Sequence, residues 1–435
     1  MDILGLIKSS GVRNFAKLLS ANVVAQVIGL VVYPILTRLY APEDFGLLNL
    51  FLSIGGVLVV VSTAEYYNAI VLPEEKKEGV SVAVLCVSWL LLTVGLSTVS
   101  VLFSHEIADL FNTPALADYY WMMPLLILAL GGWNILNYWY IRCTKYDAIS
   151  RYQLTQSTLS AGGKLGFGYA GLLQGGMIYS MVVAPVISLL ISLFSARRTL
   201  GDCRMPSWRE VRESAQKYRN FPCFSLPRSF INMLAGQLPV LLLTPLFGAE
   251  YIGWWSMAIL LGFTPIGVIV RSIYQVMYQY TTNRVNKGLS IYPYFRRFTW
   301  LVLALGIPFL SVLCYFMPDL TRIVLGSGWE ETGIYLRWML PWVLCNLLAG
   351  SIGFLADIFF KQKVGLGFEI LTSVLRTIGV VLGIVYDDFQ LSIIGYSIGT
   401  AMAVAAQYIW LIGLARNYDA TLTCSTNASI GDTEI

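Results

Sequence analysis

Long apolar stretches follow one another along almost the whole chain. Most are about 20 residues long, which is the length that a helix rising 1.5 Å per residue needs to cross a bilayer core of ~30 Å. The pattern predicts twelve transmembrane helices, at 15–37, 45–70, 79–103, 119–142, 151–173, 175–196, 218–247, 251–281, 298–317, 332–357, 364–386 and 391–415. We therefore expect an all-α polytopic membrane protein.

The loops between these stretches differ in their content of lysine and arginine. Of the 29 basic residues, 22 fall at the N-terminus, in alternate loops or after the last span, whereas only Arg38 and Arg322 fall in loops of the other side. Cytosolic loops collect basic residues, so both termini are predicted to be cytosolic. The other five basic residues lie inside predicted spans.

The composition supports the membrane class and excludes others. Hydrophobic residues make up 57% of the chain and charged residues 12%, about half the charged share of a soluble domain. The net charge of +4 follows largely from the predicted orientation and gives no sign of nucleic-acid binding. None of the seven cysteines falls in a predicted outer loop, so no disulfide framework is expected.

An internal sequence repeat divides the chain into two halves. The segment "LYAPEDFGLLNLF" from Leu39 aligns with "LFGAEYIGWWSMA" from Leu246, and "RNF" at 13–15 recurs at 219–221. Two anchors at offsets of 207 and 206 favour a duplication over a chance similarity of helical hairpins. Six spans per half then predict two lobes of the same orientation, 1–196 and 218–435, joined by a cytosolic linker at 197–217.

The first hairpin carries a family resemblance. The segments "VVYPILTRLYAPEDFGLLNLFLSI" and "NAIVLPEE", on a chain with twelve predicted spans, resemble the polysaccharide-biosynthesis flippases that export O-antigen and capsule repeat units. These belong, with the multidrug and toxin extruders (MATE) and the lipid II flippases, to the multidrug/oligosaccharidyl-lipid/polysaccharide (MOP) exporter superfamily. One departure is "EYYN" at 65–68, where relatives often carry an Arg-Tyr-Glu run.

The resemblance implies a structure, a cargo and partners. It implies two six-helix lobes in a V, around a central cavity that spans 1, 2, 7 and 8 face. The cargo would be an undecaprenyl-diphosphate-linked oligosaccharide, moved from the cytosolic to the outer leaflet of a bacterial inner membrane, with its lipid tail among the membrane lipids. A polysaccharide polymerase and glycosyltransferases would be the protein partners.

Five cations inside predicted spans suggest how such a cargo is held. They are Lys164, Arg228, Arg271, Arg337 and Arg376. A charge at the bilayer centre costs at least ~2.5 kcal/mol and marks either a functional site or a paired structural one. Three carboxylates, Glu65, Asp357 and Glu369, lie toward the cytosolic ends, so the deepest charges are positive and suit an anionic diphosphate. Lys164 and Arg376 are therefore candidate binding residues along with Arg228 and Arg271. The alternative is that each cation only holds helices together, and it has most weight for Lys164 and Arg376.

Polar residues along one face of spans 1, 7 and 8 indicate which of these cations bind the cargo. At the offset of 206, Asn22 and Gln26 of span 1 align with Arg228 and Asn232 of span 7. Span 8 carries a similar stripe, which consists of Arg271, Gln275 and Tyr278. We expect Arg228 and Arg271 to bind the diphosphate and the other stripe residues to bind the sugar. Such stripes also occur as hydrogen-bonding contacts between helices.

Several other functions lack their sequence signals. "SAGGKLG" at 160–166 is not a phosphate loop, because Thr158 stands where its first glycine belongs. The single histidine, His105, falls in an outer loop, so no cofactor or metal site is expected. The short outer loops argue against a polymerase or any other enzyme. An ion-coupled small-molecule exporter remains the alternative, although it would need buried carboxylates, and a scaffold of the polysaccharide machinery would not need deep cations.

Overall fold

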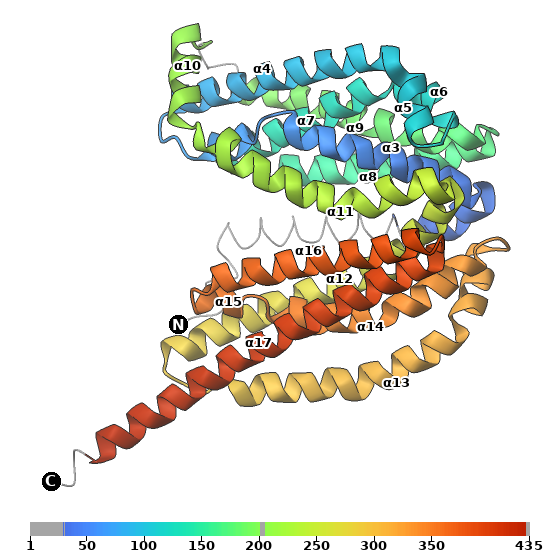
Figure 1. Ribbon diagram of the computed structural model, residues 1–435. Coiled ribbons are helices and arrows are strands. Elements are labelled where there is room, and N and C mark those ends of the chain that lie inside the picture. Colours follow the sequence, from blue (N-terminus) through green and yellow to red (C-terminus); the bar gives the residue numbers. More distant parts are fainter. Residues whose placement is uncertain (1–28, 30, 201–204, 432–435) are drawn as a thin grey trace. The chain divides into compact units, whose positions relative to one another are not determined.

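Regular structure is exclusively helical in the part of the chain that the computed structural model describes, residues 29, 31–200 and 205–431 (Figure 1). Nine of the described helices are long and apolar enough to cross a membrane. Helices satisfy all of their backbone hydrogen bonds internally, which is why they suit a bilayer core without water. The chain forms two compact units, Met1–Gly253 and Trp254–Ile435.

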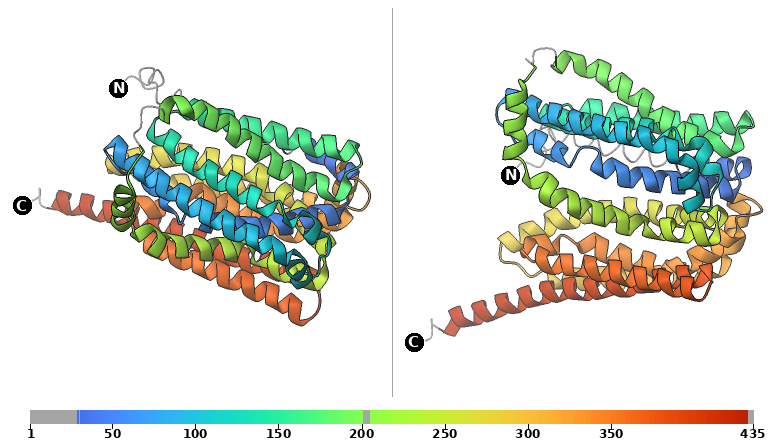
Figure 2. Two further views of the ribbon diagram at one scale, coloured as in Figure 1. Left: turned by 90° about the horizontal axis from the view of Figure 1, so that it is seen from above. Right: turned by 45° about the horizontal axis from the view of Figure 1, so that its top comes forward.

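The first unit contains twelve helical elements that lie wholly within it, among its described residues beyond residue 40. They are α3 (Pro42–Val61), η1 (Tyr66–Val71), α4 (Lys76–Ser100), η2 (Val101–Phe103), α5 (Ser104–Leu110), α6 (Ala115–Tyr120), α7 (Met123–Arg142), α8 (Tyr146–Tyr169), α9 (Leu173–Leu200), α10 (Trp208–Lys217) and α11 (Leu226–Phe247), with the π-turn η3 (Phe221–Ser225) before α11. Helix α10 lies across the start of α4 (Figure 2). There Glu78 accepts a hydrogen bond from Lys217, which raises the pKa of Lys217.

The second unit continues from the long helix α12 (Ala249–Asn286), whose first residues belong to the first unit. It contains α13 (Tyr292–Leu325), α14 (Glu330–Ile352), α15 (Leu355–Ile358), α16 (Gln362–Val385) and α17 (Phe389–Gly431). Asp419 of α17 accepts hydrogen bonds from the backbone N–H groups of Ile291 and Tyr292, at 2.8 and 3.0 Å. A carboxylate at a helix N-terminus satisfies free N–H groups, so Asp419 fixes the start of α13.

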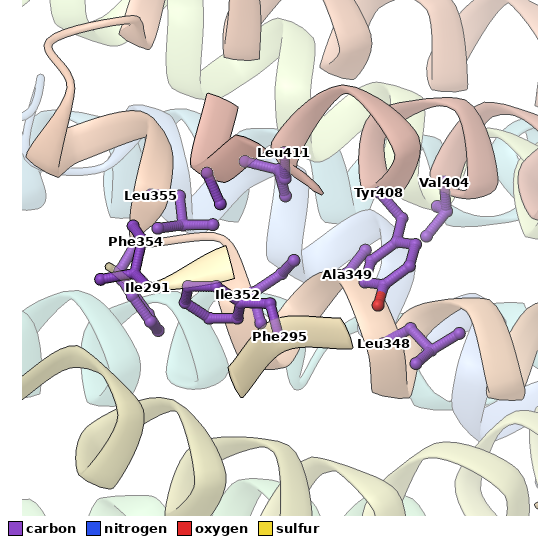
Figure 3. Packing of buried hydrophobic residues seen from close by; sticks show 11 residues of the cluster. Ile291, Phe295, Leu348, Ala349, Ile352, Phe354, Leu355, Val404, Tyr408 and Leu411 are labelled. Atoms are coloured by element: carbon purple, nitrogen blue, oxygen red, sulfur yellow. The ribbon is translucent and has the colours of Figure 1, made fainter. Parts of the chain in front are cut away.

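Helix packing inside the second unit centres on a cluster between α13, α14 and α17. Phe295, Ile352, Phe354, Leu355 and Leu411 are almost completely buried there and point toward one another (Figure 3). Apolar burial alone gives helices little preference for each other over lipid tails, so close van der Waals packing decides which helices associate. This cluster fixes how α14 and α17 pack beside α13.

The predicted spans 45–70 through 391–415 all fall on helices, whereas the first, 15–37, lies mostly outside the described residues. Twelve crossings, cytosolic termini and the boundary at 197–217 remain predictions. The second span is interrupted: α3 ends at Val61, and Ala64 and Glu65 adopt positive φ before η1 begins. Helix α12 extends to Asn286, beyond the predicted end at 281.

The internal sequence repeat corresponds to a reciprocal contact between the starts of α3 and α12. A Cβ atom on Gly46 would lie 1.7 Å from the carbonyl oxygen of Ala249, and one on Gly253 would lie 1.8 Å from that of Pro42. Both pairs obey the offset of 207, because Gly46 aligns with Gly253 and Pro42 with Ala249. Only glycine permits this approach at either position, which explains why both halves keep glycine in the turn.

Candidate substrate site

Helix α11 carries a polar face that is not used for packing against α3. Met233 and Gln237 point toward α3, where the hydroxyl of Ser53 donates to Gln237 Oε1 at 2.7 Å and a Cβ on Gly56 would meet Met233. Arg228 and Asn232 lie on another face and are exposed. Within the described part of the chain, Arg228 makes no ion pair or hydrogen bond. Its guanidinium is therefore free to bind an anion.

The chain is irregular immediately before Arg228. The π-turn η3 contains Pro222, and Pro227 follows at the start of α11. Proline donates no backbone hydrogen bond and bends helices, and Pro239 and Pro245 interrupt α11 further along. The arginine thus lies at the irregular end of a proline-rich helix.

Helix α12 has one face against its own unit and another that is open. The rings of Tyr274 and Tyr278 each lie 5.3 Å from that of Phe354, although Tyr278 keeps 43% of its surface exposed. Arg271 and Gln275 are exposed. Arg271, like Arg228, makes no ion pair or hydrogen bond in the described structure. The predicted stripe is therefore an accessible surface bordered by tyrosine rings.

Counting residues places both free arginines far from the α11–α12 turn at Gly248. Arg228 lies 20 residues before this glycine and Arg271 lies 23 after it, which corresponds to ~30 and ~35 Å along straight helices. A hydrocarbon core is ~30 Å thick. Counted along its own helix, each arginine is thus separated from this turn by about the thickness of such a core.

Lys164 occupies a different environment from the free arginines. Helix α8 runs from Tyr146 to Tyr169, earlier than the predicted span 151–173, so Lys164 lies only five residues from its end. Its ammonium lies 6.0 Å from the ring centre of Tyr33, and its carbonyl oxygen accepts a hydrogen bond from Tyr40 at 2.7 Å. The ammonium thus has an aromatic neighbour within the first unit.

Arg376 is held inside the second unit. Its guanidinium lies 5.4 Å from the ring centres of both Trp342 and Tyr396, and its Nε donates to Thr400 Oγ1 at 3.1 Å. Cation–π contacts stabilise a desolvated arginine by about 0.5–2 kcal/mol. The residue joins α14, α16 and α17, so its contacts favour the packing alternative.

Arg337 compensates for a proline. Pro318 has no N–H group, so the carbonyl of Cys314, four residues earlier in α13, has no helical donor. Arg337 Nε donates to this carbonyl at 2.8 Å. An arginine of α14 thereby satisfies a backbone group of α13, and this cation too has a structural partner.

The remaining predicted residues lie elsewhere. Asn22 and Gln26 fall outside the described residues. Arg228 and Asn232 belong to the first unit, and Arg271, Gln275 and Tyr278 belong to the second. The structure thus provides two exposed polar faces, one on each unit.

A buried carboxylate at the end of the second span was not among the predicted site residues. Glu65 is 4% exposed and has a left-handed backbone conformation. The hydroxyl of Tyr67 and the amide of Asn68 donate to its two oxygens, and Tyr67 packs edge-on against Tyr138 of α7. Among the described residues, no cation pairs with Glu65. The sequence signal was "EYYN" itself, in which Tyr67 and Asn68 supply the hydrogen bonds.

The fold is shared with solved transporters at low sequence identity. An inward-facing multidrug resistance MATE family transporter of the MOP superfamily is 15% identical with a TM-score of 0.68, over 91% of this chain and 96% of the other. The lipid II flippase MurJ, in an inward closed conformation, is 13% identical with a TM-score of 0.67, over 94% and 92%.

Sequence comparison gives the family. No curated protein matches the chain. A family model described as "Polysaccharide biosynthesis protein" matches residues 35–333, which is more than half of the chain. Together with the MATE- and MurJ-like fold, this match confirms the resemblance that the first hairpin indicated. The chain belongs to the polysaccharide biosynthesis protein family.

Proposed function

We propose that the protein is a flippase for an undecaprenyl-diphosphate-linked oligosaccharide. It would move this cargo by alternating access from the cytosolic to the outer leaflet of a bacterial inner membrane. The observation that carries the proposal is the pair of exposed arginines without partners, Arg228 and Arg271, on the polar faces of α11 and α12. The family match and the MurJ-like fold support it.

The chemistry of arginine suits a diphosphate. A guanidinium binds two phosphate oxygens with parallel hydrogen bonds, and neither Arg228 nor Arg271 must first break an ion pair within the described structure. Phosphates of lipid carriers lie at the membrane surface, and residue counting separates each guanidinium from the α11–α12 turn by about the thickness of a hydrocarbon core. In this proposal, the two arginines capture the head of a lipid from the leaflet opposite the α11–α12 turn.

The sugar would bind along the same faces. Asn232 and Gln275 offer amide groups to sugar hydroxyls, and Tyr278 offers a half-exposed ring on which a sugar can stack. Asn22 and Gln26 would extend this surface from the first span. We assign Lys164 and Arg376 no direct role in binding, because their contacts lie within the fold.

The proposal includes the predicted membrane arrangement. Twelve helices would form two six-helix lobes with both termini in the cytosol, which places the turn at Gly248 outside and both arginines at the cytosolic side. A polysaccharide polymerase and glycosyltransferases would supply and consume the cargo. Reporter fusions test the orientation: one after Arg204 should be cytosolic and one near Asn112 extracytosolic, and a periplasmic signal from the former contradicts it.

Ion-coupled export of small cations is the second candidate function. One observation favours it, namely the buried carboxylate of Glu65, because such exporters need acidic groups that bind H⁺, Na⁺ or a cationic drug. The side chain already accepts hydrogen bonds from Tyr67 and Asn68, however, and lies in a turn rather than on the α11 or α12 face. The free charges on those faces are positive, which favours the anionic cargo.

Reconstitution distinguishes the two functions. Proteoliposomes that contain the purified protein and a fluorescent undecaprenyl-diphosphate oligosaccharide should expose the sugar to a lectin on the opposite side, faster than protein-free liposomes do. The variant Arg228→Ala should remove this acceleration, whereas Arg212→Ala, on exposed α10, should retain it. Transport of a cationic dye down an imposed ion gradient, with no movement of the lipid-linked sugar, would instead establish the exporter.

A further inference from the structure

An open apolar groove runs along the first unit between α4, α7 and α9. Its volume is about 380 Å³. Its lining consists of hydrophobic residues and one glycine, namely Val80, Ala83, Val84, Val87, Leu90, Leu128, Gly132, Ile135, Leu136, Trp139, Leu189, Leu193 and Met205. Val87 of α4 and Leu193 of α9 are 42% and 40% exposed, so the groove opens to the surface of the unit along both helices.

The groove exists because α4 and α9 both pack against α7 rather than against each other. On α7, Gly132 has no side chain to fill the space, and a Cβ there would already lie 3.0 Å from Leu189 of α9. On α4, Ala83 is also small. Closely packed helices leave few voids larger than a water molecule, whereas pockets that bind small molecules measure about 300–1,000 Å³. The volume of the groove is that of a binding site.

The groove lies on the side of α7 that is turned away from α3. A Cβ on Gly55 of α3 would lie 2.6 Å from Leu126 and 3.3 Å from Met123, so these two side chains face α3. At about 100° per residue, Leu128 projects about 200° from Leu126, and Gly132 about 180° from Met123. Helix α3 in turn packs against α11. The groove is therefore separate from the polar face of α11 that is assigned to cargo binding.

The length of the groove equals half the thickness of a bilayer core. On α4 it extends from Val80 to Leu90, and on α7 from Leu128 to Trp139. These ten and eleven residues correspond to ~15 and ~17 Å along a helix. A hydrocarbon core is ~30 Å thick, so each of its two leaflets contributes ~15 Å. The groove has the length of one hydrocarbon chain of one leaflet.

The end of the groove beside α10 has the residue types of a membrane–water interface. Met205 lines this end, immediately before α10, which lies across the start of α4 (Figure 2). Trp208 of α10 is 76% exposed, and tryptophan is enriched at the level of lipid headgroups. Lys76, one turn before the first groove residue of α4, is exposed and makes no ion pair or hydrogen bond in the described part of the chain. Glu75 and Glu78 instead line a separate pocket beside α10.

We propose that this groove binds one acyl chain of a phospholipid, whose headgroup lies at the α10 end. A chain in the groove makes van der Waals contacts with three helices at once, and such contacts decide association inside a bilayer. The hydrophobic lining offers nothing to a sugar or a phosphate. The length fits a chain confined to one leaflet, whereas the longer, methyl-branched undecaprenyl tail of the cargo would extend beyond the groove. The bound chain fills the gap between α4 and α9 and thereby supports their packing on α7.

Photo-crosslinking in proteoliposomes tests the proposal. The full chain is reconstituted without cargo into phosphatidylglycerol vesicles that contain a trace of phosphatidylglycerol with a diazirine halfway along one acyl chain. Peptide mass spectrometry then locates the adducts. We expect adducts at Leu189 about tenfold more often than at Leu190, a ratio that corresponds to ~1.4 kcal/mol of preference. Leu190 is the matched position, because it neighbours Leu189 at the same depth, is 59% exposed and does not line the groove.

Variants that fill the groove should remove these adducts. Ala83→Trp places a large ring inside it and should lower the yield at Leu189 and Ile135 about tenfold, to the level of Leu190. Leu190→Trp adds the same ring on the surface beside the groove and should leave the yield unchanged. Val87→Trp covers the opening from a position that is 42% exposed, so it decides the question if Ala83→Trp does not fold.

Three outcomes would overturn the proposal. Equal adducts at Leu189 and Leu190 would show that lipid only surrounds the unit. Unchanged groove adducts in Val87→Trp and in a folded Ala83→Trp protein would place the labelled chain elsewhere. Loss of the adducts when a few per cent of undecaprenyl phosphate is added would identify the polyprenyl tail as the occupant. Because no cargo is present in the vesicles, the result does not depend on whether the protein is a flippase.

Discussion

Four arginines in the predicted spans form two groups with opposite environments. Arg337 and Arg376 donate to a carbonyl and a hydroxyl of neighbouring helices, and Arg376 also lies against two aromatic rings. Arg228 and Arg271 are exposed and have no partner in the described residues. An arginine within a membrane span is therefore a functional candidate only after the acceptors around it have been accounted for. Substitution of Arg228 or Arg271 should therefore abolish function without loss of stability. Substitution of Arg337 or Arg376 should instead lower stability without abolishing function.

The largest effect is expected at Arg271. Arg271→Ala should abolish surface glycan in a strain that depends on this protein, because the diphosphate loses a charged partner, while the protein level in the membrane stays unchanged. Arg271→Lys should restore glycan only in part, since an ammonium lacks the planar fork. Surface glycan is measured by gel and lectin staining. Normal glycan from Arg271→Ala would remove this residue from the proposed site.

Cysteine labelling tests directly whether the two groups differ in access to water. In a background without the seven native cysteines, Cys at position 228 should react fully with a membrane-impermeant thiol reagent from the cytosolic side. Cys at position 376 should stay unreacted, because Trp342, Tyr396 and Thr400 enclose that side chain. Cys at position 22 should react like that at 228 if the repeat places both on one cavity.

The labelling has a second component that depends on transport. Bound lipid-linked cargo should protect positions 22 and 228 while leaving a cytosolic control at position 212 reactive. If positions 22 and 228 resist the reagent in all conditions, they are packed helix contacts and the proposed cavity is wrong.

A moderate loss of stability is expected at Arg376. Arg376→Ala removes a hydrogen bond and two cation–π contacts and should lower the free energy of unfolding by about 2 kcal/mol. The readout is the melting temperature in detergent, with Arg271→Ala as the matched arginine variant that should melt like the wild type. A fully stable Arg376→Ala protein that fails to transport would reassign Arg376 to the cargo site.

The smallest effect concerns Arg337 and its proline. Arg337→Met should destabilise the protein by about 1 kcal/mol, because the carbonyl of Cys314 loses its donor. Pro318→Ala restores a helical N–H to that carbonyl, so adding it to Arg337→Met should recover most of the loss. The double-mutant cycle measures this coupling, and additive effects of the two changes would show that the hydrogen bond does not stabilise the fold.

The apolar pattern predicted where helices lie but not where they end. The spans from 45–70 to 391–415 fall on helices because a bilayer imposes both the length and the composition of its crossing segments. Helix α12 continues to Asn286, and α8 begins at Tyr146, since a helix can extend beyond the hydrocarbon with polar residues that hydropathy does not detect. Arg271 and Lys164 therefore lie at other distances from their helix ends than the predicted spans gave.

The partners of buried polar groups were beyond sequence reasoning. Thr400 and the carbonyl of Cys314 lie 24 and 23 residues from the arginines that they bind. Nothing in the local pattern distinguishes Arg376 from Arg271, because the acceptor comes from another helix. The repeat was different, because its two anchors were visible in the sequence. The close contacts of Gly46 with Ala249 and of Gly253 with Pro42 provide a physical reason for one of them.

The reciprocal glycine contact bears on how such a chain could have originated. Gly46 contacts Ala249, and Gly253 contacts Pro42. Because Gly46 aligns with Gly253 and Pro42 with Ala249 at the same offset, the two contacts are equivalent. Such a contact has the form of an isologous two-fold interface. Before any duplication, two copies of a half-length chain could have made the same contact as a homodimer, with one glycine serving both sides. Gene fusion would then have preserved the interface while freeing the two copies to diverge, so that one came to carry Asn22 where the other carries Arg228.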